Sequence, residues 1–566
     1  MSRKRCCGGG AAFFLVNSTL VCSPISEMLK ETIFASDTTY SKLPLNCTFD
    51  NCSLEVYNTE EKKCLFHAQD KMGLSLEDFN KNFNHFLHFS NNCQGFIFHY
   101  PLKIDYNENT FGYVNFTDCV FNEDVLLKNF SIEGEWDFSY SHFKGHFSLI
   151  KVTLTAAYAN LRLTGIIVDK NLSLSQIVIP ENAASCIYCF YMSVRGELAL
   201  VGMKQTRTGV IVVDGCTINK FRIEGNALRG LNIRNSKIET EFKINGSQLS
   251  GSKITNISLE KSAEFIIKDV KPLESTNFEN HTILIENIVF NPYKTLFKNF
   301  MYSYDNKDPV LQFKYCDLSS SYFERCDFTN ILLFSSKFEH AIFLDSTWGK
   351  IRRSVLQSIK MVQQDHYMCE HIKKLEEDQK VKVSGEEIAN MYSQLKASYD
   401  SSKKFDQAGA FYLHEMELKR AINKRRKKIG SYIIQSIIWY FSGYSQKPFR
   451  SLGWALFIFV AFTIYNFLGG LKIFTQSNYL IKSVNYDLAW SLDFFSSTQF
   501  YEDFAQSLSF SFIKILPFNY YRQYELLVVP DGAPNINLVI GVVYSFIVLA
   551  LIASTIIGIR RMVKRF

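Results

Sequence analysis

Two short stretches of this chain have the residue types and spacing of known chemical motifs. Cys186-Ile-Tyr-Cys189 is a C-x-x-C pair, which serves redox or zinc chemistry when it lies in a βαβ unit or beside a second pair of ligands. Neither context is visible. His414-Glu415 lacks the second histidine of an H-E-x-x-H site, and G-x-S-x-G, P-loop and G-x-G-x-x-G motifs are absent. We therefore expect a protein without enzymatic activity, cofactor or bound metal.

A segment near the C-terminus has some features of a pore helix. Residues 504–518 are rich in Ser and Phe and are too short to cross a bilayer. The candidate pore residues in it are Ser511, Lys514 and Pro517. A potassium filter uses backbone carbonyls of a glycine-rich sequence, whereas this segment has no glycine and Lys514 would repel cations. An interfacial helix with Lys514 reaching to water is the alternative.

A basic run could bind an anionic partner. It consists of Lys424, Arg425, Arg426, Lys427 and Lys428. Such a run can bind nucleic acid, but beside a membrane span it more simply attracts anionic lipid, at about 1 kcal/mol per charge. The chain has 62 basic and 55 acidic residues, a net charge of +7. Because lipid is the simpler partner for a basic run beside a membrane span, we expect no nucleic acid to bind.

The middle of the chain has an apolar residue at every fifth position. This period fits neither the 3.6-residue turn of a helix nor the alternation of a strand, and a β-sandwich would give even spacings. It fits a chain that turns a corner every five residues, with each apolar side chain pointing to one axis. These structural centres are Phe313, Leu318, Phe323, Phe328, Leu333, Phe338, Phe343 and Trp348.

The same signal, in steps of five or six residues, begins at Phe116 and continues to residue 259. At four faces per coil it predicts about seven or eight stacked coils. Segments 181–206 and 264–308 break the period, and we expect loops or irregular coils there. A thiol can serve as a compact apolar filler at the small inward position of a coil, and this position is occupied by Cys119, Cys216, Cys316 and Cys326.

The repeats resemble the pentapeptide-repeat family. Its pattern is a small residue, Asp or Asn, then Leu or Phe, and Cys316-Asp317-Leu318, Cys326-Asp327-Phe328 and Ala159-Asn160-Leu161 match it closely. The resemblance implies a mainly β fold, a right-handed quadrilateral parallel β-helix. Large residues often replace the small one here, as at Phe147 and Phe242, so the local coil shape can differ from the family's.

Two long apolar stretches predict transmembrane helices. Leu452–Leu471 and Ile536–Ile559 carry no charge, and each can cross roughly 30 Å of hydrocarbon. Lys and Arg are enriched before the first and after the second. The positive-inside rule then places both termini in the cytoplasm and the 472–535 loop outside. Nine N-x-[ST] sequons, none beyond residue 282, would instead fit a glycosylated solenoid outside the cell.

Helical patterns connect the repeats to the first span. Ser384-Gly-Glu-Glu387 is a capping box that opens one helix, Asp400–Lys404 is a polar break, and a second helix leads into the basic run. This hairpin, followed by Ser442-Gly443-Tyr444 and Pro448, resembles the neck of bacterial pentapeptide-repeat membrane proteins. The two spans around a short apolar segment are also similar to the layout of two-helix potassium channels, without their filter.

Before residue 114 the pattern is weaker. Cys47-Thr-Phe49 and Cys52-Ser-Leu54 have the form of two pentads, and Leu76, Phe79 and Phe83 predict a short helix after Ser75. The predicted organisation is a tail at 1–40, a stretch at 41–113 that could begin the solenoid, the β-helix at 114–349, a helical neck at 350–450, spans at 452–471 and 536–559 around the 472–535 loop, and a basic tail at 560–566.

These features predict a non-enzymatic protein of the plasma or inner membrane with two spans. The solenoid would present a protein-interaction scaffold to a protein partner whose identity the sequence does not give, with anionic lipid at the basic flanks. The alternative is a channel-like homo-oligomer for ion transport, with the β-helix as an assembly or gating domain.

Overall fold

The structure is a computed structural model of the whole chain, and it describes residues 47–563 with gaps. The residues outside the description are 1–46, 49–51, 53, 59, 70–72, 157, 181–184, 206–208, 273–282, 301–310, 355–356, 362–384, 470, 474–497, 516–527, 531–533 and 564–566. Pro517 and Ser384 are among them, so the pore and capping-box predictions at these two positions lie outside the described residues.

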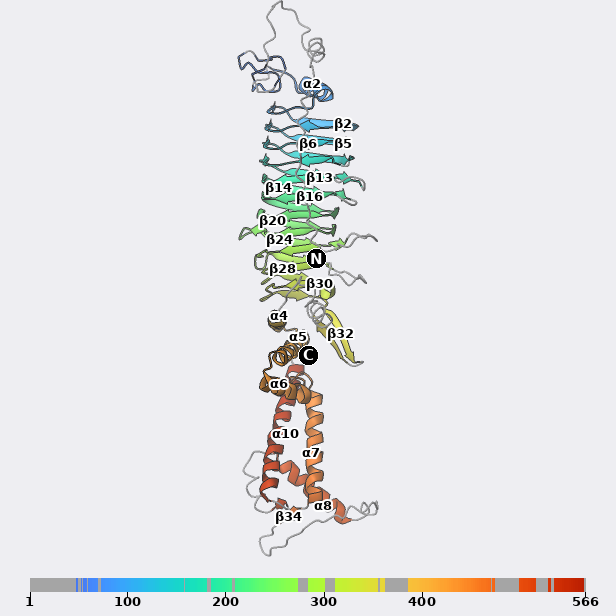
Figure 1. Cartoon of the computed structure of the whole chain (residues 1–566), viewed down its shortest axis with the longest axis vertical. Helices are drawn as coiled ribbons and strands as arrows, with labels where there is room; N and C mark the ends of the chain where they lie inside the picture. The colour runs from blue at the N-terminus through green and yellow to red at the C-terminus, as the bar shows by residue number, and fades with distance from the viewer. Residues whose placement is uncertain are drawn as a thin grey trace, which may run out of the picture. The chain divides into compact units, whose positions relative to one another are not determined.

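A parallel β-solenoid of about nine turns occupies residues 97–344, and helices follow it, as the repeat pattern predicts (Figure 1). The chain divides into two compact units, Met1–Glu239 and Thr240–Phe566. In both units the strands pair in parallel with the strands of the next coil. In the second unit Phe313 pairs with Leu333 and Phe323 with Phe343. A coil in this part of the chain is therefore four pentads long.

The strands are short, and each coil contributes to more than one sheet face. In the first unit they are β1 (Ile97–Phe98), β2 (Leu102–Phe111), β3 (Val114–Asn115), β4 (Val120–Phe121), β5 (Val125–Ile132), β6 (Glu135–Asp137), β7 (His142–Phe143), β8 (Phe147–Leu154), β9 (Asn160–Arg162), β10 (Ile167–Val168), β11 (Leu172–Ser175), β12 (Val178–Ile179), β13 (Cys186–Phe190), β14 (Ser193–Val201), β15 (Lys204–Gln205), β16 (Val210–Asp214), β17 (Thr217–Glu224), β18 (Ala227–Arg229) and β19 (Leu231–Arg234). Strand β20 (Lys237–Asn245) begins at the end of this unit.

The solenoid strands of the second unit continue in the same way. They are β21 (Gln248–Ser250), β22 (Lys253–Thr255), β23 (Ser258–Leu259), β24 (Glu264–Lys268), β25 (Lys271–Pro272), β26 (Ile283–Glu286), β27 (Thr295–Lys298), β28 (Leu311–Lys314), β29 (Tyr322–Glu324), β30 (Ile331–Phe334) and β31 (Ile342–Leu344), with the 3-10 turn η1 (Phe328–Asn330) between β29 and β30. An antiparallel hairpin, β32 (Gly349–Ser354) and β33 (Gln357–Met361), follows the last coil where the sequence predicts the helical neck.

Left-handed backbone makes the corners between the pentads. A side chain in this conformation is unfavourable, but the corner amides are paired with the next coil: the Ser320 N–H donates to the Glu339 carbonyl and the Arg325 N–H to the Leu344 carbonyl, both at 2.8 Å. The period of five thus reflects one recurring turn. The corner residues with positive φ, between 43° and 58°, are Tyr315, Ser320, Arg325, Ser335, His340 and Asp345.

Aromatic rings stack along the axis of each unit. In the first unit Phe121 lies between Phe98 and Phe143, with ring centroids 4.4 and 4.5 Å apart. In the second, Phe323 stacks on Phe297 at 5.0 Å and on Phe343 at 5.1 Å. Because parallel coils repeat the same side-chain position one strand spacing further on, like residues come into register. The abundance of Phe, 50 residues, follows from this stacking.

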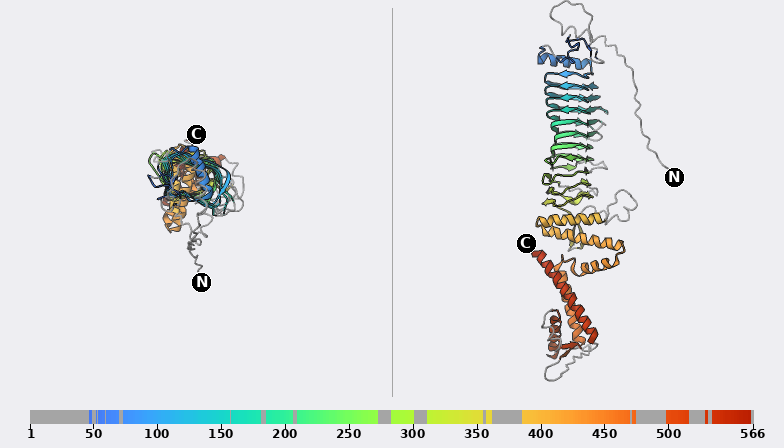
Figure 2. Two further views of the ribbon diagram at one scale, coloured as in Figure 1. Left: turned by 90° about the horizontal axis from the view of Figure 1, so that it is seen from above. Right: turned by 90° about the vertical axis from the view of Figure 1, so that its left-hand side faces the viewer.

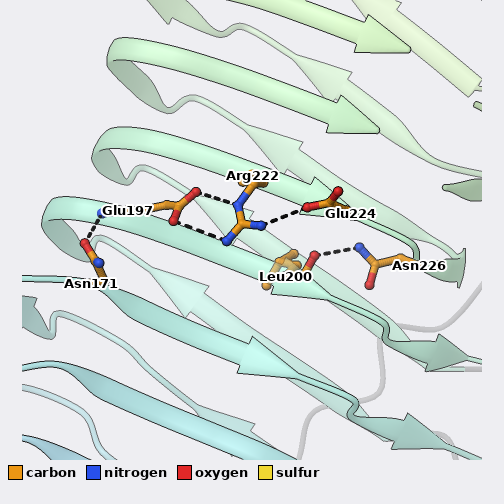
Figure 3. Close-up of polar contacts among 6 residues, drawn as sticks. All are labelled: Asn171, Glu197, Leu200, Arg222, Glu224 and Asn226. Carbon is orange, nitrogen blue, oxygen red and sulfur yellow. Dashed lines mark hydrogen bonds and ion pairs between the residues drawn. The ribbon is translucent and has the colours of Figure 1, made fainter. Parts of the chain in front are cut away.

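Polar side chains form a second kind of ladder in the first unit (Figure 3). Arg222 contacts Glu197 on the preceding coil at 2.6 Å and Glu224 on its own strand at 2.8 Å. Asn226 is buried at a corner, where its amide donates to the Leu200 carbonyl at 2.7 Å. Buried backbone groups that a corner leaves without a strand partner are thus satisfied by side chains.

The described parts of segments 181–206 and 264–308 contain strands that pair with neighbouring coils, so they are coils of the solenoid and not loops, and the predicted irregularity is present in β14. Strand β14 pairs with β17 through Val194 and Ile218, and β24 pairs with β27 through Phe265 and Thr295. The pairing of β14 with β17 shifts register after Val194, and this shift accommodates the extra residues of the coil. Extra residues in a coil interrupt the period of five but leave the inward apolar positions in place.

A helix covers the first coil. α2 (Leu76–Phe89) begins after Ser75, whose hydroxyl accepts the Asp78 N–H at 3.1 Å, as expected for an N-cap. Its Phe79 and Phe83 are fully buried, and the Phe83 ring contacts the Phe98 ring edge-on at 5.1 Å. Figure 1 shows α2 over the end of the stack beside β2. The helix therefore shields the first coil from solvent.

The helices after the solenoid all belong to the second unit, and Figure 2 shows them in orange to red. They are α4 (Gly385–Ser401), α5 (Phe405–Arg425), α6 (Ile429–Ser442), α7 (Pro448–Gly469), α8 (Thr498–Ile513) and α10 (Pro534–Val563), with a short antiparallel pair of β34 (Leu471–Ile473) and β35 (Val528–Pro530). The predicted segment at 504–518 is thus shifted, because α8 begins at Thr498 and ends at Ile513.

Candidate membrane-proximal site

The eight predicted pentad centres from Phe313 to Trp348 are all buried, and the neck closes the coil that ends this series. The last coil of a parallel solenoid has backbone groups without a following strand. Here Gln394 of α4 accepts the Phe338 N–H at 2.7 Å, and Lys404 donates to the Phe343 carbonyl at 2.7 Å. The neck is therefore a cap on the solenoid as well as a connector.

Aromatic contacts reinforce this cap. The Trp348 indole N–H donates to the Tyr399 hydroxyl at 2.7 Å, in a buried position. The Trp348 ring stacks on Phe328 at 4.3 Å and meets Phe411 of α5 edge-on at 5.0 Å. The Tyr399 ring stacks on Phe343 at 5.3 Å, and burial raises the pKa of Tyr399. The last coil and both neck helices share one apolar cluster.

The basic run lies at the junction of α5 and α6. All five of its residues, Lys424–Lys428, are exposed. Lys427 has a φ of 54° and breaks the helix there, so α6 is a separate helix that the sequence pattern did not show. Arg426 pairs with Glu386 of α4 at 2.5 Å, a contact that ties the run to the neck. As both side chains are more than half exposed, water screens this pair.

Helix α6 exposes an apolar face next to the basic run. Ile429 and Ile434 are 67% and 60% exposed, and Ile433, Ile437 and Ile438 are exposed as well. A helix with basic residues at one end and an unpaired apolar face is typical of one that lies in the headgroup region of a bilayer. Gly443, in a left-handed conformation, ends α6, and Pro448 begins α7.

Trp439 holds α6 against its neighbours. Arg420 of α5 lies over the indole at 4.4 Å, Arg450 of α7 lies 5.1 Å from it, and the indole N–H donates to Glu417 at 3.2 Å. The guanidinium groups of Arg420 and Arg450 thus both make cation–π contacts with the Trp439 indole. A groove of about 710 Å³ between α5 and α6 is lined in part by Arg420, Lys424 and Tyr432. The lining also includes the carboxylate of Glu417 and apolar side chains such as Ile433 and Ile437.

α7 and α10 are long and apolar enough to cross a membrane, over Pro448–Leu468 and Val539–Arg561. Within the chain only 33% and 28% of these spans are buried, which is unlike the core helix of a soluble protein. The two helices pack closely, with the Phe462 and Tyr544 rings stacked at 3.8 Å. A Cβ on Gly558 would lie 2.9 Å from the Pro448 Cβ, so this crossing requires a small residue.

Helix α8 packs against both long helices near its C-terminal end. Tyr544 donates to the Ser511 carbonyl at 3.1 Å and Ser545 to the Lys514 carbonyl at 2.6 Å. Of the candidate pore residues, Ser511 is fully buried, and the Lys514 ammonium lies 5.4 Å from the Phe510 ring. Its buried polar residues Asp503, Ser507 and Ser511 recur every fourth position and so share one face of the helix.

The Cys186 and Cys189 side chains lie on opposite faces of β13, one half-buried and one fully buried. Burial raises the pKa of the Cys189 thiol well above its usual value, so it is an inert apolar filler. The sequence analysis missed a different group, formed by Cys47, Cys52, Cys64 and His67. In the structure the Cys47 N–H donates to the Leu54 carbonyl at 3.0 Å, and Phe49 and Ser53 of the two predicted pentads lie outside the described residues.

No family model, curated protein or solved structure matches this chain.

Proposed function

We propose that the chain is a non-enzymatic membrane protein that presents its solenoid as an interaction scaffold for a protein partner. The observation that carries this is the docked neck. Trp348 and Tyr399 join the last coil to α4, and Trp439 joins α6 to α5 and α7 through Arg420 and Arg450. Because both connections are packed aromatic contacts, the last coil and the first span would move together. A scaffold that holds its partner at a defined distance from the bilayer requires such a rigid connection.

The proposed orientation places the solenoid, the basic run and both termini in the cytoplasm. The support is electrostatic: from Leu418 to Ser451 there are nine Lys and Arg and no acid, and basic residues near spans stay on the cytoplasmic side. Protease protection in sealed vesicles tests it. The neck should be cleaved only when the cytoplasmic face is accessible, and glycans on the sequons at Asn115 or Asn256 would reverse the assignment.

The proposal requires both membrane integration and absence of conduction. The full chain should stay in the membrane pellet at alkaline pH, and liposomes that contain it should show the ion flux of empty liposomes. A purified protein that remains soluble without detergent would exclude the scaffold at a membrane. Flux lost on Lys514→Ala, in a protein that forms rings, would exclude it in favour of a pore.

The second candidate is a channel-like homo-oligomer of the plasma or inner membrane. It is favoured by α8, which packs against α10 through Tyr544 and Ser545 and carries a buried polar face that includes Asp503 and Ser507. Buried ionisable residues at membrane depth often mark an ion path. A pore built from two-span subunits needs a ring of copies, so the number of chains per particle distinguishes the two candidates.

We expect anionic lipid to bind at the basic run. In nanodiscs, amide exchange over 429–442 should be slower with anionic lipid than with neutral lipid, because α6 lies deeper when its flanking charges are neutralised. Lys427→Glu with Lys428→Glu should abolish the difference, since each charge near the surface contributes about 1 kcal/mol. Lys261→Glu with Lys271→Glu, on the solenoid, is the charge-matched control. Equal exchange in both lipids for the unmodified protein would contradict the prediction.

A further inference from the structure

Among the described residues, one group of metal-ligating side chains converges ahead of the first coil. The ligand atoms of Cys47, Cys52, Cys64 and His67 all lie within 4.8 Å of one another. Cys47, Cys64 and His67 are buried and Cys52 is half-buried. Three thiols and an imidazole that meet at one point, mostly out of water, form the donor set of a Cys3His metal site.

The distances within the group match the edges of a coordination tetrahedron. Zinc bonds of about 2.3 Å to sulfur and about 2.0–2.1 Å to nitrogen put two sulfurs about 3.8 Å apart and a sulfur and a nitrogen about 3.6 Å apart. The Cys52 and Cys64 sulfurs are 3.8 Å apart, and the Cys47 sulfur is 3.5 Å from His67 Nδ1. The Cys64 sulfur is closer to this nitrogen, at 3.1 Å.

The histidine is oriented as a ligand by a contact outside the group. His67 Nε2 lies 2.8 Å from the Gln94 carbonyl oxygen. A carbonyl only accepts, so Nε2 carries the proton and the lone pair of Nδ1 faces the sulfurs. A backbone carbonyl on the second nitrogen is the usual outer partner of a metal-bound histidine. The His67 ring is also fixed against Phe96, edge-on at 4.9 Å.

The buried cysteines of the coils behave differently. Cys216 and Cys326 each direct the thiol to a carbonyl of the preceding coil, that of Cys189 at 3.1 Å and that of Phe297 at 3.4 Å. A thiol with such an acceptor is a satisfied filler. In the N-terminal group, by contrast, each of the three sulfurs has another sulfur or the His67 nitrogen within 3.8 Å. Convergence on a shared centre distinguishes ligands from fillers.

We propose that Cys47, Cys52, Cys64 and His67 bind one zinc ion with a structural role. Soft thiolate ligands with one imidazole favour zinc over oxygen-preferring cations. Four protein ligands also fill a tetrahedral shell and leave no position for a substrate. The site is independent of the proposed scaffold function, because it requires neither a membrane nor a partner.

The ion would fix the segment that protects the first strand of the solenoid. Phe66, between two of the ligands, stacks on Phe96 at 4.7 Å, and its carbonyl accepts the Ile97 N–H at 2.7 Å. This N–H belongs to β1, the first strand. Among the described residues of the loop that carries the ligands, Asn58 and Lys63 form a β-bridge. A bound ion would add its binding free energy to the stability of this loop.

The test is the metal content of the full chain, purified without a histidine tag and under reducing conditions. We expect one zinc per chain by elemental analysis, and a cobalt-substituted form with the visible absorption of a tetrahedral thiolate site. Cys52→Ser and Cys64→Ser should each lose the zinc. Cys216→Ser is the matched control, because a hydroxyl can keep the bond to the Cys189 carbonyl, and it should retain zinc. Chelation should speed amide exchange at Ile97 and Phe98.

Three results would overturn the proposal. The first is an unmodified protein that takes up no zinc and shows no cobalt spectrum. This experiment uses no variant, so its result does not depend on whether a variant folds. The second is a Cys52–Cys64 disulfide in the chain purified without reductant, seen as an intact mass lower by two hydrogens. The third is a folded Cys64→Ser protein that keeps its full zinc content.

Discussion

Replacing Trp348 with alanine is expected to release the neck from the last coil and to lower the free energy of unfolding of the second unit by about 3–5 kcal/mol. The indole is buried, stacks on Phe328 at 4.3 Å and contacts Phe411 at 5.0 Å. Its removal would leave a cavity where three elements meet, and it would take away the donor to the Tyr399 hydroxyl.

The measurement combines thermal unfolding in detergent with amide exchange at Phe338, whose N–H donates to Gln394 of α4. Exchange there should accelerate as the neck detaches. Tyr399→Phe is the graded variant: it keeps the ring on Phe343 but leaves the indole N–H without this acceptor, at a cost of about 1–3 kcal/mol. Tyr140→Ala, at an exposed aromatic position, should change neither readout. Unchanged exchange at Phe338 in Trp348→Ala would show that the neck does not cap the coil.

Asn226→Leu should destabilise the first unit by roughly 2–6 kcal/mol, although it replaces a polar residue by an apolar one of similar size. Asn226 is 2% exposed. Its side-chain oxygen accepts the Met203 N–H at 2.7 Å. Its amide donates to the Leu200 carbonyl, also at 2.7 Å (Figure 3). Leucine would leave two buried backbone groups unsatisfied, at about 1–3 kcal/mol each.

Chemical unfolding of the purified chain, followed by the circular dichroism of the β-sheet, measures this loss. Asn219→Leu is the matched control, because its amide also donates to a carbonyl of the previous coil, Arg195, at 3.0 Å, but at the surface. Water can replace that bond, so the change should stay within about 0.5 kcal/mol. If the two leucine variants lose equal stability, the corner bonds of Asn226 are not what holds this turn.

The strongest sequence signals were those whose cause is local. The pentad period around Phe323 arises from one turn that recurs with left-handed residues such as Ser320 and Arg325. A local repeat of this kind predicts the fold class without any long-range contact. The lengths of the two apolar stretches likewise depend only on the thickness of a bilayer. The helix after Ser75 can be predicted from the sequence because its cap and its apolar spacing are both contained within four turns.

The tertiary structure decided what depends on partners distant in sequence. Strand β14 belongs to the solenoid because Val194 pairs with Ile218 one coil later, although the period of five fails between them. Trp348 looked like one more pentad centre, and only the packed neck shows that it closes the coil through Tyr399. Such pairings cannot be predicted from the residues that are adjacent in sequence.

Taken by itself, the sequence determined a coiled parallel β fold, two apolar helices and a basic junction. The short repeat predicts the fold, the length of the apolar stretches predicts the helices, and the run of Lys and Arg predicts the junction. It did not determine that Cys47 and Cys52 face Cys64 and His67, because their spacing matches a pentad as well as a ligand pair. Only the folded loop brings four ligand atoms to one point, and convergence in space is the property that a metal ion requires.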